Sequence, residues 1–123
     1  LYSSHMDTVF GGYIKQRREK LRAKDSHYSL RQVAGKIGVA PSYLSRVERG
    51  QPTTLSEEKI INLAKVLNED PDVLLALSGK VSSDIQEVIR KRPQLFAQLI
   101  RDLKDLPDNA VLRIVREVRD GKW

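Results

Sequence analysis

Residues 29–50 constrain the fold most, because they hold two short stretches of helical periodicity separated by a single glycine. In the first stretch, apolar residues recur three and four positions apart, which places them on one face of a helix. This stretch ends at Gly38, and glycine readily adopts the left-handed conformation that closes a helix. In the second stretch, Leu44 and Val47 stand three positions apart. The segment therefore predicts two short helices joined by a tight turn.

The rest of the chain has the same helical periodicity and lacks the alternation typical of strands. The expected helices cover about 8–24, 30–37, 41–49, 56–67, 71–78, 83–92, 94–105 and 108–119. The expected N-caps are Ser29, Asp70 and either Thr54 or Ser56. Pro93 and Pro107 separate the last three helices, because proline cannot continue the helix before it. The sequence predicts an all-α protein in which a five-helix domain precedes a three-helix C-terminal extension.

The chain divides into three expected parts. Residues 1–6 have the composition of an expression-tag remnant that ends at the native start, Met6. Residues 7–79 form the expected five-helix domain, and residues 80–123 form the extension. The chain has no cysteine, which excludes disulfides and thiolate metal sites and fits the reducing cytoplasm. Apolar runs span only a few residues, so we expect no membrane segment and a cytoplasmic location.

Positive charge is concentrated in the N-terminal part of the chain. The net charge is +6 overall. Residues 7–55 carry ten basic residues (Lys or Arg) and four acidic ones (Asp or Glu). Residues 56–78 carry two basic and five acidic residues, and residues 79–123 carry ten basic and seven acidic residues. A basic region of this kind favours a polyanionic partner, either nucleic acid or an anionic membrane surface.

The second helix of the 29–50 segment has an outward face. Leu44 and Val47 anchor its inner side to the core, which leaves the residues of the other side free. These outward residues are Pro41, Ser42, Tyr43, Ser45 and Arg46. An exposed helix of this size fits the major groove of DNA.

This segment resembles the helix-turn-helix of the lambda-repressor-like Xre/Cro family. It has the family's Leu-x-x-Val-Ala core, the glycine turn, the Ser-x-Leu-Ser-x-Val-Glu-x-Gly recognition helix and the following proline, and the resemblance covers about residues 8–78. The resemblance implies a bacterial or phage transcriptional regulator that binds double-stranded DNA, with a dimeric repressor on a palindromic operator as the expected form. We expect no cofactor.

The resemblance also implies which residues touch DNA bases. Ser42 and Arg46 are the expected direct readers, and Arg46 can make the bidentate contact to guanine. Tyr43 is expected to touch a thymine methyl group or the backbone. The complete set of expected base-contacting residues is Pro41, Ser42, Tyr43, Ser45 and Arg46.

Phosphate contacts and a scaffolding pair are expected around the motif. The expected phosphate-contacting residues are Arg17, Ser29, Arg31, Gln32, Lys36 and Arg49; for the basic ones the alternative is a solvated helix face. Phage repressors often place a polar residue at the start of the first motif helix, where this chain has Leu30. In similar proteins an acid at the position of Glu48 pairs with an arginine of the first helix, and Arg18 is the matching residue.

The last three helices are too apolar to lie free in water. They can pack onto the five-helix domain or form a self-complementary dimer surface, and dimerisation is the expected outcome. The expected dimer or partner surface comprises Leu95, Phe96, Leu99, Ile100, Leu103, Val111 and Val115. The extension also resembles regulators that pair with an ImmA/IrrE-type metallopeptidase, or with a toxin as its antitoxin. The alternative function is therefore a protein-interaction module.

Catalysis and metal binding are not expected from this sequence. It contains no set of nucleophile, base and orienting residue and no glycine-rich phosphate loop. The one histidine of the native part, His27, has no partners spaced for a metal. Because no ligand-binding domain is evident, we also expect no small-molecule inducer.

Overall fold

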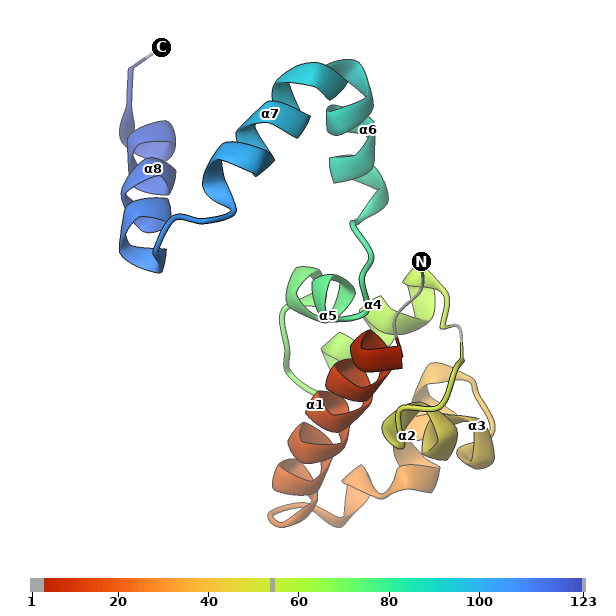
Figure 1. The fold of residues 1–123 in the computed structure, drawn as a ribbon. Coiled ribbons are helices and arrows are strands. Elements are labelled where there is room, and N and C mark those ends of the chain that lie inside the picture. Colours follow the sequence, from red (N-terminus) through yellow and green to blue (C-terminus); the bar gives the residue numbers. More distant parts are fainter. Residues whose placement is uncertain (1–3, 54, 123) are drawn as a thin grey trace. The chain divides into compact units, whose positions relative to one another are not determined.

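The structure is a computed structural model that describes residues 4–53 and 55–122, and every regular element in them is a helix (Figure 1). The elements are α1 (Ser4–Arg22), a short 3-10 helix η1 (Ser26–Tyr28), α2 (Leu30–Ile37), α3 (Pro41–Glu48), α4 (Glu57–Val66), α5 (Pro71–Leu77), α6 (Ser83–Lys91), α7 (Pro93–Leu103) and α8 (Asp108–Asp120). The predicted all-α fold, with five helices followed by three, is confirmed. The chain divides into two units between Ser82 and Ser83.

Local signals set most helix boundaries. The side-chain oxygens of Ser29, Ser56 and Asp70 accept hydrogen bonds from first-turn amides at 3.2, 3.1 and 2.9 Å. These are the caps that the sequence predicts for α2, α4 and α5; Thr54, the alternative for α4, lies outside the described residues. Gly38 has a φ of 75°, so it ends α2 in the left-handed conformation.

The ends of α1 differ from the prediction. The helix begins at Ser4 rather than near residue 8, and no proline in this stretch prevents the additional turn. It ends at Arg22, and a short turn then leads into η1, where the Asp25 carboxylate accepts a hydrogen bond from the His27 amide at 2.9 Å. Residues 1–3 of the predicted tag remnant lie outside the described residues, and the remnant stays a prediction.

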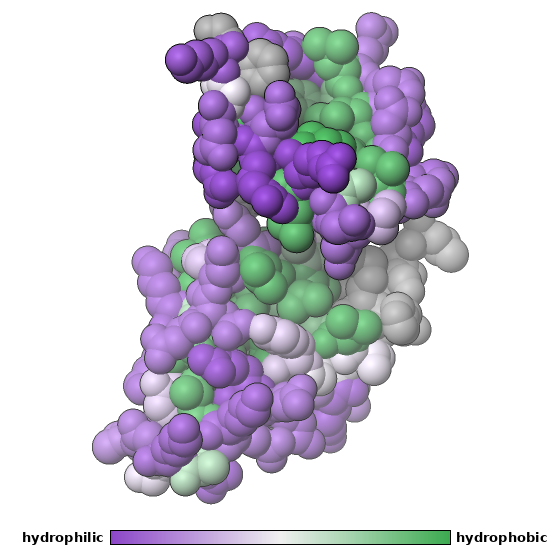
Figure 2. Space-filling view, turned by 90° about the vertical axis from the view of Figure 1, so that its left-hand side faces the viewer, coloured by the Kyte–Doolittle hydropathy of each residue, from purple (hydrophilic) through white to green (hydrophobic). Residues whose placement is uncertain are grey.

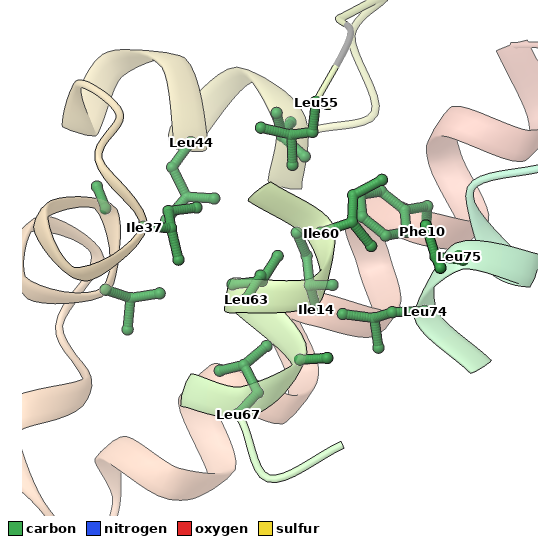
Figure 3. Close-up of a cluster of buried hydrophobic side chains, with 14 residues drawn as sticks. Phe10, Ile14, Ile37, Leu44, Leu55, Ile60, Leu63, Leu67, Leu74 and Leu75 are labelled. Atoms are coloured by element: carbon green, nitrogen blue, oxygen red, sulfur yellow. The ribbon is translucent and has the colours of Figure 1, made fainter. Parts of the chain in front are cut away.

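One apolar core joins all five helices of the N-terminal unit. The labelled side chains in Figure 3 come from α1 to α5 and from the residues that flank α4, Leu55 and Leu67, and they point toward one another. The buried apolar residues are Phe10, Ile14, Val33, Ala34, Ile37, Leu44, Val47, Leu55, Ile60, Leu63, Ala64, Leu67, Leu74 and Leu75. Leu55 precedes α4 and had no periodic signal, and the Lys80 ammonium holds this loop by donating to the Leu55 carbonyl at 2.7 Å. This core fixes α3 to the rest of the unit.

The C-terminal unit has a different character. Among its described residues, α6, α7 and α8 have no buried side chain. Leu95 is 70% exposed, Val118 is 62% exposed and Ile100 is 57% exposed. Figure 2 shows apolar side chains of this unit at the surface between polar ones. Each helix therefore keeps an apolar face that its own unit does not cover.

Every helix in the described part of the chain is too short or too polar to cross a membrane.

Candidate DNA interface

The residues predicted to contact DNA bases lie on α3. Leu44 and Val47 lie in the core, at 0% and 3% exposure, and they fix the inner side of the helix. Ser42 and Arg46 are exposed, and Pro41, Tyr43 and Ser45 are partly exposed. Within its own unit, α3 therefore keeps its outer side open, and the five predicted base-contacting residues lie on this one short helix.

Backbone packing holds the end of α3 close to α1. Gly11 on α1 is buried, and a Cβ atom at this position would lie 2.2 Å from the Val47 carbonyl oxygen and 2.9 Å from that of Glu48. Only glycine permits this approach, because any side chain would collide with the α3 backbone. The close contact sets how far α3 stands out from the core.

A buried ion pair adds a second anchor. The Arg18 guanidinium donates two hydrogen bonds to the Glu48 carboxylate, from Nε at 2.7 Å and from an Nη at 2.9 Å, and a third to the Tyr28 carbonyl at 3.2 Å. Both side chains are buried, and the hydrogen bond to Glu48 raises the pKa of Arg18. Arg18 thus ties α1 to the end of α3 and to η1, and its pairing with Glu48 is the one that the family resemblance implies.

Two cations on the motif lie over tyrosine rings. The Arg46 guanidinium carbon lies 5.2 Å from the centre of the Tyr43 ring on α3, and the Lys36 ammonium on α2 lies 5.2 Å from the centre of the Tyr28 ring. Both distances are within the roughly 6 Å range of cation–π attraction. Sequence reasoning missed these pairs, although the three-residue spacing of Tyr43 and Arg46 is a signal for contact on a helix.

The predicted phosphate-contacting residues on α2 and at the end of α3 differ in their surroundings. Arg31 and Lys36 are exposed on α2. The Ser29 hydroxyl caps α2 by accepting from the Gln32 backbone amide at 3.2 Å, and it donates to the Gln32 side-chain oxygen at 3.3 Å; both side chains thus order the start of α2. The Arg49 side chain folds back over α3, where its Nε donates to the Ser45 carbonyl at 3.3 Å.

Arg17 has partners inside the fold. Its Nε lies 3.1 Å from a Glu69 carboxylate oxygen and donates to the Leu67 carbonyl at 3.1 Å. The Tyr13 hydroxyl also donates to Glu69, and this hydrogen bond raises the pKa of Tyr13. These contacts join α1 to the turn between α4 and α5, so a phosphate contact by Arg17 stays a prediction.

Lys59 of α4 supports the motif turn, and sequence reasoning missed it. Its ammonium donates to the Gly38 carbonyl at 3.3 Å, across 21 residues of sequence. No local pattern signals such a distant contact. Beside it lies a hollow of about 300 Å³ whose lining residues are Val39, Tyr43, Leu55, Ser56 and Lys59.

His27 lies beside an acid of its own loop. Its Nδ1 is 2.7 Å from an Asp25 carboxylate oxygen, and the hydrogen bond from the His27 amide lowers the pKa of Asp25. Among the described residues, no three His, Asp or Glu side chains gather in a way that could hold a metal ion.

Comparison with known proteins identifies the motif. Residues 14–74 match the family model described as helix-turn-helix. The HTH-type transcriptional regulator SinR of Bacillus subtilis is 33% identical over 88 residues, which cover 67% of this chain and 75% of SinR. This chain belongs to the helix-turn-helix family of transcriptional regulators. The uncharacterized HTH-type transcriptional regulator MT0491 of Mycobacterium tuberculosis is 36% identical over 69 residues, which cover 56% of this chain and 45% of that protein. No solved structure matches significantly.

As a member of this family, the chain is a DNA-binding transcriptional regulator. The predicted family is confirmed. Helices α2 and α3, joined at Gly38, are the two helices of the helix-turn-helix motif. The matched residues include the whole motif together with α4 and most of α5.

Proposed function

We propose that this helix-turn-helix regulator is a dimeric repressor that reads a palindromic operator with α3. The observation that carries the proposal is the two-sided character of α3, in which Leu44 and Val47 are buried while Ser42 and Arg46 are exposed. Arg46 would donate both arms of its guanidinium to guanine O6 and N7, a contact worth about 1–3 kcal/mol of discrimination against other bases. Ser42 would bond to a base edge or a phosphate, and Pro41, Tyr43 and Ser45 complete the surface.

Positively charged side chains around α3 would fix the protein on the DNA backbone. Arg31, Lys36 and Arg49 are exposed on the motif, and we propose that they neutralise phosphates. Such contacts set orientation and register without encoding sequence. Each neutralised phosphate should add about 0.9 to the slope of log affinity against log salt. Ser29 and Gln32 would assist these phosphate contacts by ordering the start of α2 near the DNA backbone.

The apolar faces of α6, α7 and α8 support a homodimer. The proposed surface is the one predicted from the sequence: Leu95, Phe96, Leu99, Ile100, Leu103, Val111 and Val115. All seven residues are exposed or partly exposed within their unit. Covering them with a second copy would remove apolar surface from water at about 25 cal/mol per Å². A twofold dimer would present its recognition helices about 34 Å apart, one turn of DNA.

The same exposed faces also favour one alternative, a protein-interaction module. In this case a toxin or an ImmA/IrrE-type peptidase, rather than a second copy, would cover α6 to α8. Sedimentation of the purified chain separates the two, because the dimeric repressor would sediment at twice the chain mass and the module would remain a monomer until its partner is added.

A regulator of a bacterial or phage genome would act in the cytoplasm.

Selection of bound sequences from random double-stranded DNA tests the proposed function. A dimeric reader should enrich an inverted repeat whose half-sites are centred about one helical turn apart. A single asymmetric site would contradict the palindromic dimer, and no enrichment at all would contradict sequence-specific reading. Expression of a reporter gene behind the selected site then distinguishes repression from activation.

A further inference from the structure

We propose that Tyr43 is a positioning residue for base recognition, because its ring holds the Arg46 guanidinium in the orientation from which Arg46 reads DNA. This inference rests on the proposed role of Arg46 and adds a second residue to the specificity of α3. Tyr43 would therefore set base preference without touching the base that Arg46 reads.

The geometry leaves Arg46 free to donate while it stacks. The guanidinium carbon lies 5.2 Å from the Tyr43 ring centre. A guanidinium is planar, so its face can rest on an aromatic ring while the N–H groups at its edge point elsewhere in a rigid fork. The bidentate contact to guanine needs only this edge. Stacking on Tyr43 and reading a base are therefore compatible in one conformation.

Tyr43 is better fixed by the fold than Arg46 is. The Tyr43 ring is partly buried and packs against the core, and it lines the hollow between α3 and the start of α4 with Val39 and Leu55. Arg46 is exposed and carries a long side chain, which loses conformational freedom when it binds in one geometry. A side chain that is already ordered in the free protein loses less on binding. Tyr43 would reduce this loss for Arg46.

The test measures base discrimination by four full-length variants: Arg46→Ala, Tyr43→Leu, Tyr43→Phe and the double Tyr43→Leu/Arg46→Ala. Each is titrated with the selected operator and with operators carrying every other base pair at the position where Arg46→Ala loses its preference. Tyr43→Leu should reduce discrimination there by about two- to fivefold, the worth of an exposed cation–π contact. Tyr43→Phe keeps the aromatic face and should retain discrimination. In the Arg46→Ala background, Tyr43→Leu should not change base discrimination any further.

Tyr28→Leu is the matched control, because Tyr28 is also a partly buried tyrosine with a cation over its ring, Lys36 on α2. It should leave base discrimination unchanged. Urea unfolding of each variant checks that the fold is intact, and Tyr43→Met takes the place of Tyr43→Leu if the latter unfolds.

Three results would overturn the inference. One is full discrimination by Tyr43→Leu. Another is equal loss in Tyr43→Phe, which would assign the effect to the hydroxyl group rather than to the aromatic ring. The third is an undiminished effect of Tyr43→Leu in the Arg46→Ala background. If Arg46→Ala itself keeps full discrimination, the proposed role of Arg46 fails and the inference falls with it.

Discussion

Removing the Glu48 carboxylate should cost the N-terminal unit much of its stability. In Glu48→Leu, the Arg18 guanidinium stays buried but retains only the Tyr28 carbonyl among the partners described above. The side chains of Arg18 and Glu48 are 7% and 6% exposed, so water screens the pair little. Removing one partner of a buried ion pair leaves an uncompensated charge and costs about 3–5 kcal/mol. A small domain has only about 5–15 kcal/mol of stability in total.

The companion variant Arg18→Met/Glu48→Leu separates charge burial from packing. Replacing both partners by apolar side chains of similar volume removes the unpaired charge and is often neutral or stabilising. Urea unfolding, followed by the helical signal in circular dichroism, measures the free energy of unfolding of both variants and of the wild type. We expect a large loss for Glu48→Leu and recovery of most of it in the double variant. A single-variant cost below about 1 kcal/mol, the range of exposed pairs, would refute the reasoning.

Three further predictions concern other parts of the chain. Lys36→Ala should weaken binding to all DNA sequences alike and lower the salt slope by about 0.9; a changed base preference would argue against a phosphate contact. Leu99→Asp should convert the dimer to a monomer in sedimentation, whereas Gln94→Asp on the same helix should not; an unchanged mass would exclude this face. Because the hydrogen bond to Glu69 raises the pKa of Tyr13 above 10.0, the stability it contributes is present below that pH and lost as pH rises through the folded-state pKa. Tyr13→Phe should therefore lose less thermal stability than wild type above pH 10, and parallel losses would contradict this.

Features that depend on neighbouring residues could be predicted from the sequence. The caps at Ser29, Ser56 and Asp70 and the left-handed turn at Gly38 follow from side-chain chemistry within three or four positions. The spacing of Leu44 and the other apolar residues of the five-helix domain predicts most of the residues that are buried in the core. Local chemistry therefore sets where α2, α4 and α5 begin, where α2 ends and which helix faces of this domain are buried.

Contacts between distant parts of the chain could not be predicted in the same way. Examples are the ion pair of Arg17 with Glu69 and the hydrogen bond from Lys59 to Gly38, which join residues far apart in the sequence. The burial of Leu55 likewise has no periodic signal in the sequence. They follow from the packing of whole helices against one another. The contact of Arg18 with Glu48 was expected only because the family resemblance supplied it.

We propose above that α3 reads DNA through Arg46. A comparison of Arg46→Ala with Arg49→Ala, on the selected operator and on all of its single base-pair variants, tests this role. Arg49 is the control, an exposed arginine at the end of the same helix whose proposed partner is a phosphate. We expect Arg46→Ala to lose its preference for guanine at one position of each half-site and Arg49→Ala to bind every variant more weakly in unchanged order. An unchanged order of preference in Arg46→Ala would contradict the claim.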